Sequence, residues 1–267
     1  MVKYSFEDIK KIALKPQNNL WNVFFAEFFA IPMIWFIANF LPFITPNIAT
    51  TIGLIFWLAS VWVMFLAFSS PVLFIVAALL YELGLIFDIA DGRLSKLKKI
   101  NTGGIGRLYD NLSGYIKTIL LCIVVGIGLF NLTQRIIYVI IPLVYAWLDM
   151  FLSLWYMLSY KANKDKVLVS VMKEKNEKKP VEASLFFRVQ KVFLRFRLRM
   201  GFTNVETEAV VFFICPIIVF FTGNVLLFYW AFLLAILMRL VMFVVFAFLQ
   251  FKLLFKNLKE LRANEIN

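Results

Sequence analysis

The sequence predicts an all-α fold, a polytopic bundle of membrane-spanning helices. Of its 267 residues 62% are hydrophobic and 31 are Phe, whereas only 16% are charged, against roughly a quarter in soluble domains. Long apolar runs alternate with short polar stretches, and about 20 apolar residues suffice for a helix to cross a bilayer. We therefore expect an integral membrane protein with several crossings.

Six apolar segments are long enough to be transmembrane helices. They lie at approximately 48–68, 71–90, 105–130, 136–160, 205–222 and 225–250. A seventh apolar segment, 20–43, contains Pro32 and Pro42, which we expect to interrupt a helix. Whether this segment crosses is not decided by its hydrophobicity alone.

The basic residues indicate which side of the membrane each connection faces, because cytoplasmic flanks collect Lys and Arg. These residues gather at the N-terminus, in the loop after residue 91, in the stretch 161–199 and in the C-terminal tail. All four places lie on one side only if 20–43 does not cross. We therefore expect 20–43 to be an interfacial or re-entrant helix, with both termini in the cytoplasm.

Four parts of the chain follow from this topology. They are an N-terminal cytoplasmic segment with the interfacial helix (1–47), four transmembrane helices (48–160), a cytoplasmic loop with a basic amphipathic helix (161–203), and two transmembrane helices with a basic tail (204–267). Within the third part, the mixed charge and few aromatic residues of 161–184 predict a mobile loop.

The basic amphipathic helix that follows this loop is expected to lie flat on the membrane. Its positive face carries Arg188, Lys191, Arg195 and Arg199. This pattern is typical of an anchor to anionic headgroups, although the same face could guide an anionic lipid or nucleotide. The net charge of +12 follows from such cytoplasmic flanks, and with no nucleic-acid-binding motif present we expect no nucleic-acid partner.

The chemistry open to this chain is narrow because it contains no histidine. Ser-His and Cys-His nucleophile pairs and histidine zinc sites are therefore excluded. Cys122 and Cys215 each lie inside an apolar stretch, where a thiol usually packs as a small hydrophobic group. Any reaction must use carboxylates, lysines or a metal ion.

Carboxylates and glycines gather where one apolar segment ends and the next begins. Asp88 and Asp91 are three residues apart and share a helix face, and Gly106 precedes Asp110 by four. Mg²⁺ is commonly held by a few carboxylates together with substrate phosphates, and a glycine lets a phosphate approach the backbone. These residues predict a metal-assisted phosphate site, unless the carboxylates simply pair with neighbouring basic side chains.

Two elements of the sequence resemble the CDP-alcohol phosphotransferase family, also called the CDP-alcohol phosphatidyltransferase family. The run 88–110 is similar to the family signature D-x2-D-G-x2-A-R, followed by G-x3-D-x3-D. Upstream, residues 45–50 (TPNIAT) resemble the T-P-N-x-x-T element that opens the first crossing in many members.

The resemblance implies a reaction and a set of site residues. It implies a transferase of phospholipid biosynthesis that moves a phosphoalcohol or phosphatidyl group from a CDP-alcohol or CDP-lipid to an alcohol acceptor and releases CMP. The implied ligands of Mg²⁺ or Mn²⁺ are Asp88, Asp91 and Asp110, and the implied substrate-binding residues are Asn47, Gly92, Lys96 and Gly106. It also implies a homodimer with a cytoplasmic active site, but the acceptor alcohol is not readable.

The chain departs from the family pattern at three positions. Ser95 and Lys96 stand where the family has Ala and Arg, and the last position of the pattern differs as well. Gly114 stands where the family has an aspartate that is thought to act as the base on the attacking hydroxyl. Glu206 and Glu208 are weak candidates to replace it, at the mouth of the fifth crossing, and they are equally typical of a helix start. Lys117 lies on the face of Asp110, as a charge partner or a snorkelling side chain.

Three functional hypotheses follow. The first is an active phosphotransferase that retains the metal ligands. The second is a catalytically impaired relative that binds CDP-lipid, metal or a partner, because the base position is vacant. The third is a small transporter with an embedded cation site, which does not account for the glycine spacing. Elsewhere, we expect Asp149 and Arg239 to form a structural pair between helices.

Overall fold

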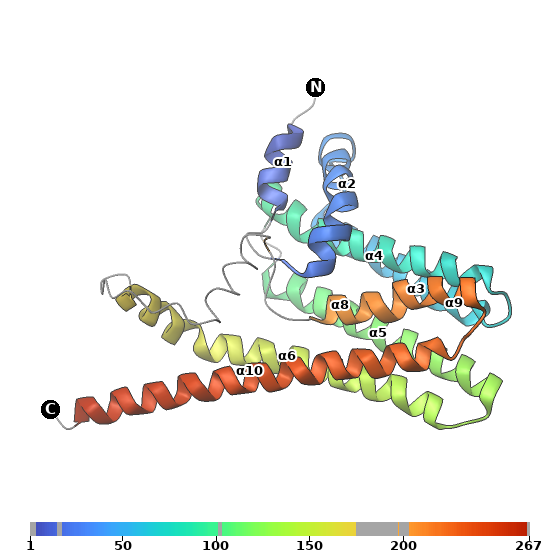
Figure 1. Cartoon of the computed structure of the whole chain (residues 1–267). Helices are drawn as coiled ribbons and strands as arrows, with labels where there is room; N and C mark the ends of the chain where they lie inside the picture. Colours follow the sequence, from blue (N-terminus) through green and yellow to red (C-terminus); the bar gives the residue numbers. More distant parts are fainter. Residues whose placement is uncertain (1–3, 15–17, 101–102, 175–196, 198–202, 266–267) are drawn as a thin grey trace.

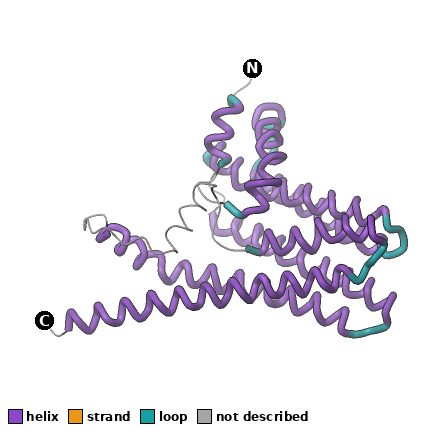
Figure 2. The backbone as a smooth tube through the Cα atoms, in the orientation of Figure 1, coloured by secondary structure: helices purple, strands orange, loops and turns teal. Residues whose placement is uncertain are grey.

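The computed structural model describes residues 4–14, 18–100, 103–174, 197 and 203–265, with side chains not described for residues 103–107, 110, 156–174 and 249–265. Almost all of these residues are helical, and no strand occurs among them (Figure 2). The helices are α1 (Phe6–Ala13), η1 (Asn22–Ala26), α2 (Glu27–Phe40), α3 (Pro46–Ala67), α4 (Val72–Leu97), α5 (Gly103–Thr133), α6 (Ile137–Glu174), α8 (Asn204–Ala209), η2 (Val210–Ile214), α9 (Cys215–Thr222) and α10 (Leu227–Glu265).

The long helices run side by side and form the predicted polytopic bundle (Figure 1). In the described part of the chain, seven helical segments are long and apolar enough to cross a membrane. Six of them correspond to the predicted crossings, with α8, η2 and α9 together forming the fifth. The seventh is Asn22–Phe40, so by length and composition the count exceeds the predicted six by one.

The segment α2 runs across α4 instead of along the long helices (Figure 1). Its buried side chains, including Ala30 and Ile34, pack with Ala90 and Leu94 in the last turns of α4. The expected interruption at Pro32 is wrong, because Pro32 lies inside α2, which continues to Phe40. The interfacial or re-entrant position of this segment stays a prediction.

Local sequence signals account for several helix ends. Thr45 caps α3 by accepting a hydrogen bond from the Ile48 amide at 3.3 Å, and Pro46 occupies the first turn, where its missing N–H costs nothing. Gly223 ends α9 in the left-handed conformation, with a φ of 68° that a residue with a Cβ rarely adopts.

The predicted loop at 161–184 is partly wrong, because α6 continues as a helix to Glu174. Residues 161–174 contain neither Gly nor Pro, so nothing in the local sequence stops the helix that emerges from the membrane. Residues 175–184 lie outside the described residues. So does the predicted basic face of Arg188, Lys191, Arg195 and Arg199.

The helices α3 and α4 approach each other closely. A Cβ at Gly84 would lie 2.3 Å from the Trp57 ring, and a Cβ at Gly53 would lie 3.1 Å from the Gly84 carbonyl oxygen. The Trp57 indole donates a hydrogen bond to the Tyr81 carbonyl at 3.1 Å, and Ser60 donates one to the Ala77 carbonyl at 2.8 Å. Small residues permit this close packing within a membrane.

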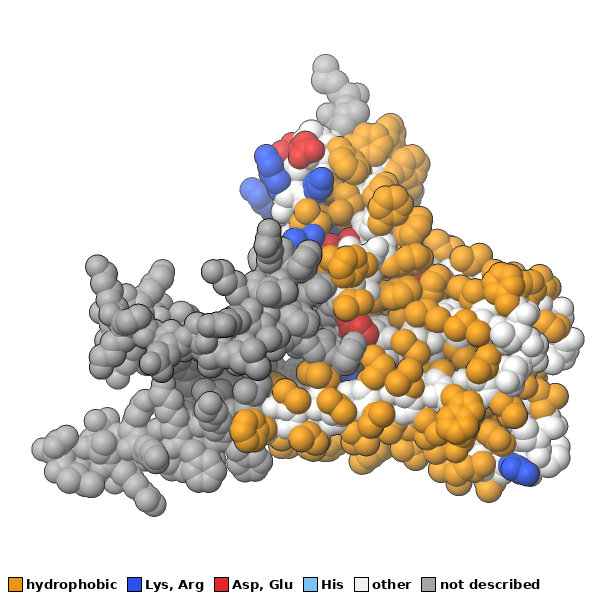
Figure 3. All heavy atoms as spheres, viewed as in Figure 1, with side chains coloured by type: hydrophobic (Ala, Val, Ile, Leu, Met, Phe, Trp, Pro, Cys, Tyr) orange, Lys and Arg blue, Asp and Glu red, His pale blue; other side chains and the backbone are white. Residues whose placement is uncertain are grey.

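The described surface agrees with an integral membrane protein. On the face shown in Figure 3, hydrophobic side chains cover the long helices, and most of the visible charged side chains gather around α1. Exposed large side chains on this protein include Phe24 and Trp62, 65% and 64% exposed, which a soluble protein would tend to bury.

We expect Gly84→Ala to destabilise the bundle by about 1–3 kcal/mol, because the added methyl group overlaps the Trp57 ring. Gly92→Ala is the matched control, since a Cβ there meets no described atom within 4 Å. Thermal unfolding in detergent micelles, followed by tryptophan fluorescence, measures both. Equal melting temperatures for the two variants would contradict the close α3–α4 contact.

Candidate active site

Three helix ends meet at one end of the bundle: the start of α3, the end of α4 and the start of α5. The Thr50 hydroxyl on α3 donates a hydrogen bond to Oδ2 of Asp91 on α4, at 2.5 Å. The hydroxyls of Thr51 on α3 and Tyr109 on α5 lie 3.3 Å apart. The T-P-N element and the two halves of the carboxylate motif are therefore neighbours in space.

The carboxylates of α4 lie at the boundary between packed and open regions. Asp91 is buried, Asp88 one turn before it is half-buried, and Gly92 is exposed. A Cβ at Gly92 would have 4 Å of clear space with respect to the described atoms. Asn47 and Lys96 are exposed at the same ends of α3 and α4. The end of α4 thus presents its carboxylates beside open space.

The predicted residues on α5 are only partly described. Asp110 and Gly106 lie in the first turns of this helix, but the side chain of Asp110 and the surroundings of Gly106 lie outside the described residues. The contact of Tyr109 with Thr51 places this part of α5 beside the start of α3. Within the described residues, no group of three Asp, Glu, Cys or His could hold a metal ion.

Thr50 is a site residue that motif reasoning did not single out. Its hydroxyl lies 3.2 Å from the Pro46 carbonyl oxygen and 2.5 Å from the Asp91 carboxylate, so it can orient that carboxylate. The sequence does mark this residue, because Thr50 is the last residue of the T-P-N-x-x-T element. Only the packing of α3 on α4 reveals which carboxylate it contacts.

Gly114 leaves a gap one turn after Asp110. No described atom lies within 4 Å of the position that a Cβ would occupy there. The next turn begins the packed interior, where the Thr118 hydroxyl lies 3.0 Å from the Gly114 carbonyl oxygen. At this half-buried position, the described atoms thus leave room for a side chain.

Glu208 and Lys117 form a buried ion pair below this gap. Lys117 Nζ lies 2.7 Å from Glu208 Oε2 and 4.1 Å from the centroid of the Trp57 ring. The hydroxyls of Tyr81 and Thr118 each donate a hydrogen bond to Glu208 at 2.7 Å. Lys117 therefore does not snorkel, and Glu208 rather than Asp110 is its described partner.

Glu206 connects the start of α8 to the N-terminal segment. Its carboxylate accepts hydrogen bonds from the Thr203 amide and the Leu20 amide, each at 2.7 Å, and it completes the capping box of α8. Both glutamates thus have structural contacts, as helix-start carboxylates often do. A base role for either stays a prediction.

Arg93, which follows Gly92 in the motif, is paired away from the site carboxylates. Its guanidinium lies 3.6 Å from the buried carboxylate of Glu27 on α2. The Arg197 guanidinium contacts the same carboxylate at 3.1 Å, and the Asn18 amide donates to it at 2.7 Å. The contact ties α2 to the end of α4.

The predicted pair of Asp149 and Arg239 is confirmed. Arg239 Nε lies 3.0 Å from Asp149 Oδ1, and both side chains are buried. Arg239 also donates a hydrogen bond to the Asp149 carbonyl at 3.2 Å. This pair joins α6 to α10, and it supports a structural role because neither residue lies near the motif in the sequence.

Comparison with known families agrees with this geometry. A family model described as CDP-alcohol phosphatidyltransferase matches residues 43–200, more than half of the chain. The chain belongs to this family. The match begins just before the T-P-N element, includes the whole carboxylate motif and ends before α8. No curated protein sequence matches the chain.

Membership establishes the general chemistry. The family consists of transferases that move phosphatidyl groups in phospholipid synthesis, acting on CDP-alcohol substrates and an alcohol acceptor and generally depending on a divalent metal ion. The predicted resemblance is therefore confirmed, while the individual roles of the site residues stay predictions.

We expect Glu208→Leu to lower the stability of this phosphatidyltransferase-family protein by about 3–5 kcal/mol, because it leaves Lys117 charged and unpaired in the interior. The double variant Lys117→Met/Glu208→Leu should recover most of that loss, since it removes both charges. Denaturation in mixed micelles measures the two losses. If the double variant is no more stable than Glu208→Leu alone, the unpaired charge of Lys117 is not the cause of the lost stability.

Proposed function

We propose that this protein transfers a phosphoalcohol or phosphatidyl group from a CDP-alcohol or CDP-lipid to an alcohol acceptor, with release of CMP. The observation that carries the proposal is the hydrogen bond between Thr50 and Asp91. It joins the two sequence elements of the family at one place, where three helix ends converge beside open space.

Asp88, Asp91 and Asp110 are the residues that would hold Mg²⁺ or Mn²⁺. Their donor set consists only of carboxylate oxygens, which suits these hard cations. Asp88 and Asp91 are one turn apart on α4, and Thr50 holds the Asp91 carboxylate in one orientation. When bound, a divalent cation would neutralise the charge of the substrate pyrophosphate.

The nucleotide would lie over the glycines of the motif. No described atom lies within 4 Å of a Cβ position at Gly92, so the backbone can be approached closely there, and Gly106 is the corresponding glycine of the motif on α5. The exposed Lys96 ammonium and the Asn47 amide would contact the phosphates and the nucleotide. The acceptor oxygen then forms a bond to the β-phosphorus, and the bond from that phosphorus to the CMP oxygen breaks.

Removal of the acceptor proton is the step for which this chain lacks the family residue. Glu208 is connected to Gly114 through the Thr118 hydroxyl, but three donors already occupy the carboxylate oxygens of Glu208. A substrate hydroxyl would have to displace one of these contacts. We therefore infer a slow transferase whose acceptor loses its proton without a carboxylate at position 114.

The second candidate function is a catalytically impaired relative that binds CDP-lipid, metal or a partner. The specific observation in its favour is the gap at Gly114, where the base is missing and nothing described fills the space. The active transferase and the impaired relative would both bind CDP-lipid and metal, but only the transferase would release CMP at a measurable rate.

We further infer that the site and both termini face the cytoplasm. Lys and Arg are concentrated at the N-terminus, after Asp91, between 161 and 199 and in the tail, which supports this orientation. The family resemblance supports a homodimer.

The first test is CMP release by the purified protein in lipid micelles. CDP-diacylglycerol and CDP-alcohols are offered with a panel of acceptor alcohols, in Mg²⁺, in Mn²⁺ and in chelator. We expect metal-dependent and acceptor-dependent release that Asp91→Asn reduces by at least 100-fold, roughly the cost of losing a key electrostatic contact. Glu7→Gln, an exposed carboxylate change on α1, is the control. Intact CDP-lipid binding without release would favour the impaired relative.

Restoring a carboxylate at position 114 separates the two candidates further. Gly114→Asp should fit without a clash, because no described atom lies within 4 Å of its Cβ, and it should raise CMP release by roughly 100-fold or more if a base is the missing part. Gly114→Asn has the same shape without the base and should give no gain. Equal rates for the two variants would show that proton removal does not limit this protein.

A further inference from the structure

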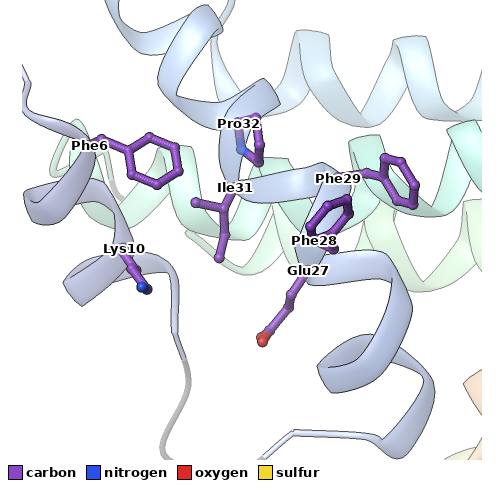
Figure 4. Close-up of a pocket in the computed structure, with 7 residues that line it drawn as sticks. All are labelled: Phe6, Lys10, Glu27, Phe28, Phe29, Ile31 and Pro32. Atoms are coloured by element: carbon purple, nitrogen blue, oxygen red, sulfur yellow. The ribbon is translucent and has the colours of Figure 1, made fainter.

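A cleft lies between α1 and the first half of α2 (Figure 4), and no residue of the carboxylate motif lines it. Its volume is about 430 Å³, within the range of roughly 300–1,000 Å³ typical of ligand pockets. It is lined by Phe6, Lys10, Glu27, Phe28, Phe29, Ile31 and Pro32. In Figure 4, Phe6 and Ile31 face each other across the cleft, while Lys10 and Glu27 lie toward its lower end.

The lower end of the cleft carries more positive than negative charge. Glu27 already accepts contacts from Asn18, Arg93 and Arg197. Within the described part of the chain, the ammonium of Lys10 has neither an ion pair nor a hydrogen bond. Arg93 and Arg197 therefore already balance the Glu27 carboxylate, and the ammonium of Lys10, which lines the same cleft, would attract an additional anion.

Most of the residues that form the walls of the cleft are apolar. Phe6 and Phe29 are 44% and 45% exposed, and Phe28 is 74% exposed. These Phe rings offer an apolar surface to an acyl chain, and a lysine beside them can extend its ammonium group to the level of the lipid headgroups. A free inorganic anion would leave these apolar walls without a partner.

We propose that this cleft binds one anionic phospholipid of the bilayer. Its phosphate lies beside Lys10, and an acyl chain packs between Phe6 and Ile31 and along Phe28. Neither Asp88 nor Asp91 lines this site, and the proposal does not depend on the transferase reaction. Glu27 nevertheless links it to the end of α4, because the carboxylate that lines the cleft also pairs with Arg93.

Native mass spectrometry of the full chain, released from micelles with phosphatidylglycerol and phosphatidylcholine at equal concentration, tests the site. We expect phosphatidylglycerol to be retained in preference to phosphatidylcholine. Lys10→Ala should weaken that retention about fivefold, because the attraction between one lysine and an acidic headgroup changes the binding affinity by about this factor. Lys11→Ala is the matched control, because Lys11 is exposed on the same helix and does not line the cleft.

A second variant tests the apolar half of the proposal. Ile31→Trp fills the cleft without changing its charge and should reduce phosphatidylglycerol retention at least as much as Lys10→Ala. Equal effects of Lys10→Ala and Lys11→Ala would overturn the site, as would equal retention of the two lipids. Competition by excess inorganic phosphate would overturn the lipid as ligand in favour of a free anion.

Discussion

The close contact between α3 and α4 is the constraint on which the site depends. The absence of a Cβ at Gly53 and Gly84 lets the two backbones approach, and the Trp57 ring fills the space beside Gly84. Lipid offers little hydrophobic driving force between helices, so such contact must come from shape and hydrogen bonds. As a result, Thr50 reaches the Asp91 carboxylate, and the two motif elements become one site.

Buried ion pairs between helices also fix the arrangement of the bundle. Lys117 pairs with Glu208, Asp149 with Arg239, and Glu27 with Arg93, each pair joining different helices. An unpaired charge in the membrane is costly, so each pair favours one relative placement of its helices. A carboxylate inside a membrane is therefore not by itself a sign of catalysis.

Segments outside the region that matches the family model contact the region around Gly114 and the end of α4. The family match covers the T-P-N element and the carboxylates, yet the residue that packs beneath the vacant position comes from α8, beyond that match. The segment before the match also contributes, since Glu27 on α2 holds Arg93. The parts outside the matched region thus pack against the motif and hold its side chains in place.

Composition and motif spacing by themselves determined the class of fold, the family and the two carboxylates that share a face of α4, because hydrophobic length and helical periodicity are local properties. The predicted loop at 161–184 was wrong for residues 161–174, since charged residues without Gly or Pro are compatible with both loop and helix. Only the tertiary structure decided the partners of Asp91, Glu208 and Arg93. Such contacts join residues as far as 127 positions apart, as Tyr81 and Glu208 are, and depend on which helix faces pack together.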